Sequence, residues 1–277
     1  MSKSWLQFLR EQHPFTGRFI ASNGDLINFA DFLRSQPISI ARGMLPGALP
    51  FGSYGERVTT GAETNFPVWP DGATLTPIQY GVQMTIKSTS ANDTAVGTGA
   101  RIMEIHYLDG NLNYQNEYVT LDGLNPVLTV ATDIRWIECM HMHEFGSLFA
   151  AAGTITASFG AIVYSQINAG KVRCASSFRM VPKGKVAYID GAVGSSTSVT
   201  ADTSSVLSLV ASELDNHKYH NPLLLIPFAG IGVQNSSIGF TFPPGIKFNE
   251  GTLIGGLHST NKAATITMSW FGRLENA

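Results

Sequence analysis

Short runs of alternating apolar and polar residues dominate the chain from about residue 57 onward. The runs are rich in Val, Ile, Thr, Tyr and Phe, and turn signals such as those at 109–111 and 182–184 separate them. No long helical period interrupts the runs, which disfavours parallel strands joined by helices. A turn about every 8 to 12 residues is typical of antiparallel double-sheet folds. We therefore predict an all-β fold with an antiparallel β-sandwich or jelly-roll body.

The first forty residues follow a different pattern and predict a short helical arm. Ser4 and Gln7 fit a capping box for a first helix, and a second helix is expected to begin near Asp25 and end before Pro37. Helices of this length are marginal alone in water, so the apolar face must dock, either on the chain's own β body or on a partner. The residues predicted to form this docking face are Trp5, Phe8, Leu26, Phe29 and Leu33.

Three segments follow from these patterns. Residues 1–56 are expected to hold the arm and a Gly- and Pro-rich linker, residues 57–170 a first β-sandwich domain, and residues 171–277 a second one. The break near residue 170 rests on the Asn-Ala-Gly-Lys sequence at 168–171. One continuous double-sheet body would give much the same pattern.

The chain carries few charges. Lys and Arg number 18 and Asp and Glu number 20, which is 14% of the residues, whereas a typical soluble domain has about 25%. Either Ser, Thr, Asn and Gln solvate the surface, or neighbouring subunits cover much of it, and we favour the second explanation. A homo-oligomer is therefore expected. The net charge of −2 and the lack of a Lys/Arg run argue against nucleic acid or a membrane surface as a partner.

Three features that the sequence lacks predict where the protein is located. The N-terminal segment has no uninterrupted apolar core of the kind that a secretory signal needs. The longest apolar stretch, residues 222–233, holds two prolines and is shorter than the ~20 residues of a membrane helix. The two cysteines, Cys139 and Cys174, are too few for a disulfide framework, so we expect both to be reduced in a protein assembled in the cytosol.

The sequence IECMHMHEF at 137–145 raises the possibility of a metal site. In an extended strand, Cys139, His141 and His143 would share one face with Ile137, while Glu144 and both methionines would lie on the other. Imidazole and thiolate suit zinc or iron, but the other histidines of the chain offer no matching pair. We expect packed or hydrogen-bonded histidines. A metal bound by His141 and His143 is expected only at an oligomer axis, where three copies would bring six imidazoles together.

Catalytic motifs find little support. A cupin enzyme would place its glutamate several residues after the second histidine, whereas Glu144 follows His143 directly. The Gly-rich loops at 52–55 and 97–99 lack the spacing of a nucleophile elbow and the lysine of a phosphate loop. A pair of carboxylates for glycoside cleavage is still possible, because residues that are distant in the sequence can come together when the chain folds. We expect neither enzymatic activity nor a cofactor.

Aromatic residues suggest a further possibility, which is stacking on sugars by a receptor-binding module. Cross-strand pairing inside a sandwich is the commoner use of such residues. The candidates are Tyr54, Trp69, Tyr80, Tyr107, Tyr114 and Tyr118.

Three segments of the β-rich part carry a resemblance to known proteins. They are ANDTAVGTGARIMEIHYLDGNLNYQNEYVTLDGLNPV at 91–127, RMVPKGKVAYIDG at 179–191 and GFTFPPGIKFNEGTLI at 239–254. Their pattern resembles that of virion structural proteins of tailed bacteriophages, especially those of marine bacteria. The resemblance covers about residues 80–277 by pattern, and it does not extend to the arm. It implies a non-enzymatic, β-rich accessory part of the head, neck or tail, and it supplies no catalytic residues.

Together these observations predict a homo-oligomeric virion protein, with a trimer favoured, that assembles in the host cytoplasm. An appendage or adaptor at the tail, neck or baseplate is preferred, docked to other virion proteins through the N-terminal arm. The alternatives are a capsid decoration or cement protein and a module that binds host-surface glycans.

Overall fold

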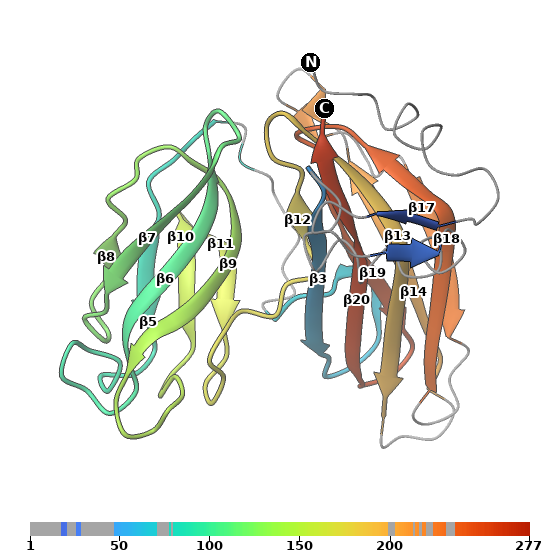
Figure 1. The fold of residues 1–277 in the computed structure, drawn as a ribbon. Helices are drawn as coiled ribbons and strands as arrows, with labels where there is room; N and C mark the ends of the chain where they lie inside the picture. The colour runs from blue at the N-terminus through green and yellow to red at the C-terminus, as the bar shows by residue number, and fades with distance from the viewer. Residues whose placement is uncertain are drawn as a thin grey trace, which may run out of the picture.

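The computed structural model (Figure 1) describes residues 18–20, 26–28, 47–70, 78, 80–198, 203–212, 214–215, 218–219, 224–230 and 236–277. Within these ranges the chain forms strands and no helix, and the strands pair antiparallel. The prediction of an all-β antiparallel protein is therefore confirmed. In these ranges no helix is long and apolar enough to cross a membrane.

The first body consists of two sheets built from residues 85–167. One sheet has the order β11 (Ile162–Ile167), β10 (Ile155–Phe159), β5 (Thr85–Ser88) and β8 (Val127–Leu128), and the other has β7 (Tyr114–Thr120), β6 (Ala100–Asp109) and β9 (Ile134–Phe145). Alternate side chains of both sheets meet in one buried cluster that includes Ile86, Met103 and Met140. One face of the sheet formed by β7, β6 and β9 packs in this core, and the opposite face lies on the outside of the body.

The second body combines the C-terminal strands with two strands from early in the chain. One sheet has the order β18 (Ser236–Phe248), β13 (Lys185–Thr197), β20 (Thr265–Asn276) and β3 (Leu49–Val58). The other has β12 (Arg179–Met180), β19 (Leu253–Thr260), β14 (Ser205–Ser212) and β17 (Leu224–Gly230), with β4 (Glu63–Pro67) also paired to β19. Trp270 and Ile254 lie in the core that the two sheets share.

Residues 49–67 thus pair with the last strands of the chain and not with β5 to β11. The first body ends at Ile167 and β12 begins at Arg179, on either side of the expected break near residue 170. The three-part domain division and the sandwich or jelly-roll topology stay predictions.

Two further strand pairs are short. They are β15 (Leu214–Asp215) with β16 (Lys218–Tyr219), and β1 (Arg18–Ile20) with β2 (Leu26–Asn28).

The prediction of a second helix in the arm is wrong at the start of that helix, because Leu26 lies in β2 and pairs with Ile20. A short helix is marginal alone, whereas pairing gives each strand a hydrogen-bonding partner. The other predicted docking residues, Trp5, Phe8, Phe29 and Leu33, lie outside the described residues.

Candidate functional site

A cluster of one carboxylate and three imidazoles lies on the outer face of the sheet formed by β7, β6 and β9. His141 Nε2 lies 3.0 Å from Glu104 Oε2, and His106 Nε2 lies 3.2 Å from Glu104 Oε1. His143 is more distant, with its Nδ1 3.8 Å from Glu104 Oε2. We call Glu104, His106 and His141 the Glu-His-His cluster; their ligand atoms all lie within 4.8 Å of one another.

Strand alternation and register bring these side chains together. In β6 the alternation sends Met103 and Ile105 into the core and Glu104 and His106 outward. In the antiparallel pairing of β6 with β9, Glu104 lies opposite His141. The sequences Glu-Ile-His and His-Met-His therefore place their polar side chains on one surface.

The third strand, β7, supplies polar contacts to the cluster. The Tyr114 hydroxyl lies 2.8 Å from His106 Nδ1, and Asn116 Nδ2 donates a 3.1 Å hydrogen bond to Glu104 Oε1. The rings of His106 and His141 stack with centroids 5.1 Å apart. Ring orientation is thus set from both sides of the strand that carries Glu104.

Two groups of the cluster, His106 and Glu104, have pKa values below their usual range. Burial lowers the pKa of His106, and it outweighs the attraction of Glu104 for the charged ring. Burial acts to raise the pKa of Glu104, but the Asn116 hydrogen bond and the two nearby imidazoles lower it overall. The lower pKa values favour the neutral imidazole of His106 and the ionised carboxylate of Glu104, which are the forms in which these groups bind metal ions.

A β-bulge in β9 changes the row of side chains predicted from the sequence. The register with β6 shifts between His106 and Tyr107, because Glu138 is an extra residue in β9. Ile137 therefore joins the core with Met140 instead of sharing the outer face with His141. His141 and His143 do share that face, as expected.

Sequence reasoning missed Glu104 and discarded His106 as an unpaired histidine. The available signal was that Glu104 and His106 are two residues apart, as are His141 and His143. Each pair therefore lies on one face of its strand. Pairing of the two strands could not be read from the sequence, so the signal could not be used.

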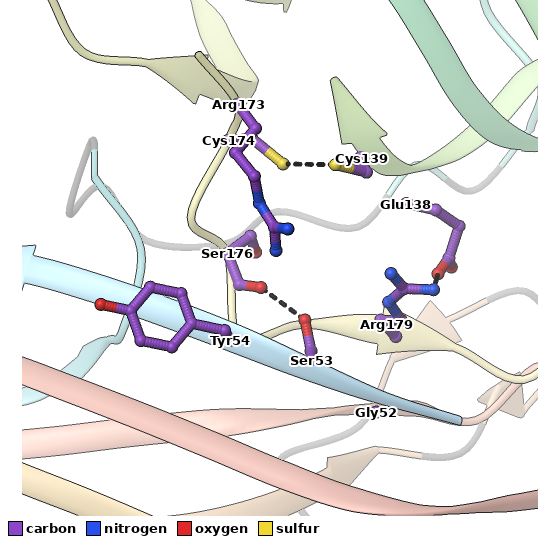
Figure 2. Close-up of a pocket in the computed structure, with 9 residues that line it drawn as sticks. All are labelled: Gly52, Ser53, Tyr54, Glu138, Cys139, Arg173, Cys174, Ser176 and Arg179. Carbon is purple, nitrogen blue, oxygen red and sulfur yellow. Dashed lines mark hydrogen bonds and ion pairs between the residues drawn. The ribbon is translucent and has the colours of Figure 1, made fainter. Parts of the chain in front are cut away.

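A second candidate is a cavity of about 200 Å³ between β3 and β9, shown in Figure 2. Its polar lining includes the Ser53 hydroxyl, which donates a 2.6 Å hydrogen bond to the Ser176 carbonyl. Two free thiols meet at its edge, with Cys139 Sγ 3.3 Å from Cys174 Sγ. That hydrogen bond lowers the pKa of Cys174, although burial opposes the shift.

Glu138 also lines this cavity and is almost completely buried. Burial raises its pKa to about 7, and Arg179 and the Met180 N–H offset the effect only in part. Arg179 Nη1 lies 3.6 Å from one carboxylate oxygen, and the Met180 N–H donates a 2.9 Å hydrogen bond to the other. The cavity therefore combines a carboxyl that titrates near neutral pH with a thiol pair, but it holds no recognisable catalytic arrangement.

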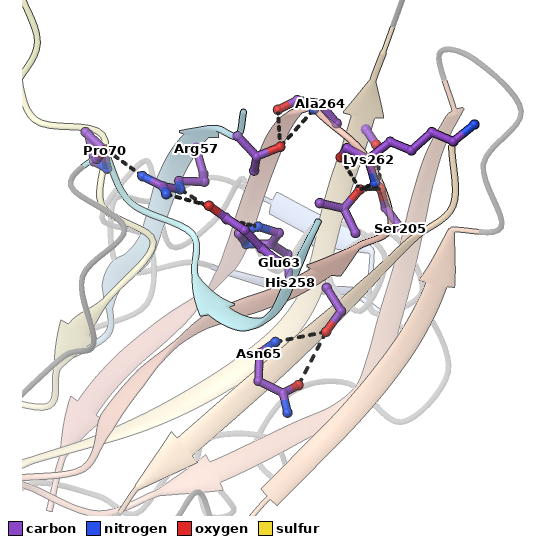
Figure 3. Close-up of polar contacts among 12 residues, drawn as sticks. Arg57, Glu63, Asn65, Pro70, Ser205, His258, Lys262 and Ala264 are labelled. Carbon is purple, nitrogen blue, oxygen red and sulfur yellow. Dashed lines mark hydrogen bonds and ion pairs between the residues drawn. The ribbon is translucent and has the colours of Figure 1, made fainter. Parts of the chain in front are cut away.

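His258 is buried and has a structural partner. His258 Nε2 lies 2.9 Å from Glu63 Oε2, and Arg57 donates to both oxygens of the same carboxylate (Figure 3). Burial lowers the pKa of His258 against the opposing influence of Glu63. The three side chains come from β3, β4 and β19, so the network fixes strands to one another.

The six aromatic candidates divide into two groups. Trp69 and Tyr107 are buried, while Tyr54, Tyr80, Tyr114 and Tyr118 are exposed. The Tyr118 ring contacts that of His143 in a tilted arrangement, with centroids 4.6 Å apart, so β7 carries aromatic rings on both sides of the Glu-His-His cluster.

No protein-family model and no curated protein matches this chain. Comparison with solved structures finds chains from infectious bursal disease virus. The T13 viral particle is 10% identical with a TM-score of 0.20, and the Gx strain is 10% identical with a TM-score of 0.21. Each alignment covers 89% of this chain and 82% of the other. At these TM-scores the similarity carries no argument about fold or function.

Proposed function

We propose that this chain is a non-enzymatic structural component of a tailed-phage virion. It acts as a homo-oligomer, with a trimer favoured, and serves as an appendage or adaptor at the tail, neck or baseplate. Its two bodies are of the sandwich or jelly-roll type. The observation that carries the proposal is the combination of few charges with many exposed apolar side chains, which suits a surface finished by neighbouring subunits.

Exposed apolar residues occur on both bodies. On the first they include Val96, Val130 and Phe149, and on the second Val193 and Phe271. Val193 and Phe271 belong to β13 and β20, whose hydrogen-bonded Ser195 and Thr267 are uncharged. These uncharged positions of β13 and β20 lose little solvation when a second protein covers them, whereas Glu56 of β3, opposite Thr267, carries a charge that pairs with Lys171.

The segment that resembles phage proteins also has a structural use in this chain. Asp93 is fully buried and accepts hydrogen bonds from Ser88 Oγ (2.6 Å) and from the backbone N–H groups of Ala100, Ala152 and Gly153 (2.7 to 2.9 Å). The carboxylate thus joins the Gly-rich turn before β6 to the segment before β10. This arrangement organises loops and supplies no reactive group.

The N-terminal arm is proposed to dock the protein onto the particle. Deletion of residues 1–40 should leave a folded β body that no longer incorporates into particles, because the docking face is lost. Incorporation is measured by immunoblotting of purified particles, and circular dichroism verifies the fold. Normal incorporation of the truncated chain would defeat the docking role.

The oligomeric state is tested separately by mass photometry of the full chain. A discrete homo-oligomer supports a covered surface. A monomer that stays soluble at high concentration would contradict it.

Two alternative functions are also supported by specific observations. A capsid decoration or cement protein would use the same neutral surfaces but would bind assembled capsids in place of tails. A glycan-binding module is favoured by exposed Tyr114 and Tyr118 on one strand. A glycan array probed with the purified protein decides this second alternative.

A further inference from the structure

We propose that Glu104, His106 and His141 form a binding site, complete within one chain, for a first-row transition-metal dication such as Zn²⁺. This differs from a site at an oligomer axis, because it needs no second copy. It is also independent of the proposed function in the virion.

The spacing of the ligand atoms carries the first step. An ion that binds these atoms at about 2.0 to 2.2 Å holds them roughly 3 to 3.5 Å apart. Glu104 Oε2 already lies 3.0 Å from His141 Nε2, and Glu104 Oε1 lies 3.2 Å from His106 Nε2. One ligand atom from each of the three residues lies within 4.8 Å of the other two. The side chains are partly exposed, so small rotations can admit an ion between them.

The donor set selects the class of ion. Two imidazoles and one carboxylate suit Zn²⁺ and its neighbours in the first row, whereas Mg²⁺ and Ca²⁺ prefer oxygen ligands only. The cluster lies on the outer face of its sheet, and the His141 side chain is 37% exposed. Water can therefore complete the coordination shell.

Neighbouring side chains hold the ligands in place. Tyr114 contacts Nδ1 of His106, which leaves Nε2 as the nitrogen directed toward Glu104. When the ion binds Nε2, Nδ1 carries the proton, and this N–H donates a hydrogen bond to the Tyr114 oxygen. Asn116 similarly orients the Glu104 carboxylate. Such outer contacts are the usual support of metal-binding histidines and carboxylates.

The rival explanation is an ion-pair cluster that never binds a metal. In that case Glu104 simply accepts hydrogen bonds from two imidazoles on a sheet surface. The two explanations differ in whether the purified chain binds Zn²⁺ with a definite stoichiometry, and in whether that binding requires Glu104.

The test is titration of the full chain, stripped with a chelator, with ZnCl₂ in a calorimeter. We expect one Zn²⁺ per chain, and visible absorption from Co²⁺ that Zn²⁺ displaces. Glu104→Gln, His106→Gln and His141→Gln should each weaken binding by about tenfold or more, since each removes a ligand. A stoichiometry of one ion per three chains, or no saturable binding, would overturn the proposal.

Matched controls separate this site from adventitious binding to surface histidines. Glu144→Gln removes an exposed carboxylate from the same strand, β9, and should leave the affinity unchanged within about twofold. Thermal unfolding without metal verifies that each variant folds. If the Glu104→Gln variant folds and binds Zn²⁺ as tightly as the natural chain, the Glu104 carboxylate is not a ligand and the proposal is wrong.

Discussion

The environment of Glu138 strongly changes the acidity of its buried carboxyl. The bulge in β9 turns its side chain away from the core and toward the second body. There it accepts a hydrogen bond from the Met180 N–H and lies beside Arg179. These two contacts are too few to replace water, so burial dominates and raises its pKa to about 7.

This shift predicts a pH-dependent contribution to stability. In the unfolded chain the carboxyl ionises near 4.5, and in the folded chain near 7. The folded state therefore binds the extra proton between these values, and the contribution of Glu138 is full below pH 4.5 and is lost as the pH rises to 7. The loss is roughly 3 kcal/mol.

The measurement is urea unfolding of the natural chain and of Glu138→Gln at pH 5 and pH 8. The variant should gain about 3 kcal/mol in free energy of unfolding relative to the natural chain between these pH values. Glu144→Gln on the same strand serves as the exposed control and should show no such gain. An identical pH response of Glu138→Gln and the natural chain would contradict the shift.

The strands themselves were predictable wherever alternation was clear. In β6, Met103, Ile105 and Tyr107 point inward in a strict period of two, and the expected strand forms there. Turn chemistry was also informative, since the turn signals at 109–111 and 182–184 lie between strands in the structure. Local sequence was sufficient for these elements because both signals act over a few residues.

Long-range pairing and bulges were not predictable. The pairing of β3 with β20 joins residues that are about two hundred positions apart, and no local pattern encodes it. The bulge at Glu138 moved Ile137 to the opposite face from the expected one. For the same reason two of the three residues of the Glu-His-His cluster were missed, because bringing them to His141 needs the register between β6 and β9.

The early strands β3 and β4 depend on polar contacts to hold their place beside the last strands. Glu63 bonds Arg57 of β3 and the fully buried His258 of β19. Glu63→Ala should therefore cost about 3 kcal/mol of stability, since it leaves a buried imidazole and a guanidinium without their partner. Urea unfolding measures this cost.

The matched comparison is Glu56→Ala, also in the early strands. Its carboxylate lies 3.2 Å from Lys171 Nζ, and that lysine is more than half exposed. Water screens this pair, so the change should cost less than about 1 kcal/mol. Equal costs for the two variants would show that the Glu63 network does not hold β4.

The two bodies meet through a separate apolar cluster. Leu108 and Trp136 of the first body pack with Phe178, Met180, Val210 and Leu253 of the second. Trp136 is almost completely buried at this junction. Burial of this size couples the bodies, so that the natural chain should unfold in one transition.

Trp136→Ala should separate the unfolding of the two bodies, because it removes the largest side chain of the junction and leaves a cavity there. When Trp136→Ala is made in a Trp5→Phe background, the remaining tryptophans are Trp69 beside β4 and Trp270 of β20, so fluorescence of that variant reports the second body while circular dichroism reports both. The fluorescence and circular dichroism transitions should coincide before the Trp136→Ala change and diverge after it.

The control is Met103→Ala in the core of the first body, which keeps the junction and should shift both transitions together. Coincident transitions in Trp136→Ala would place the coupling elsewhere.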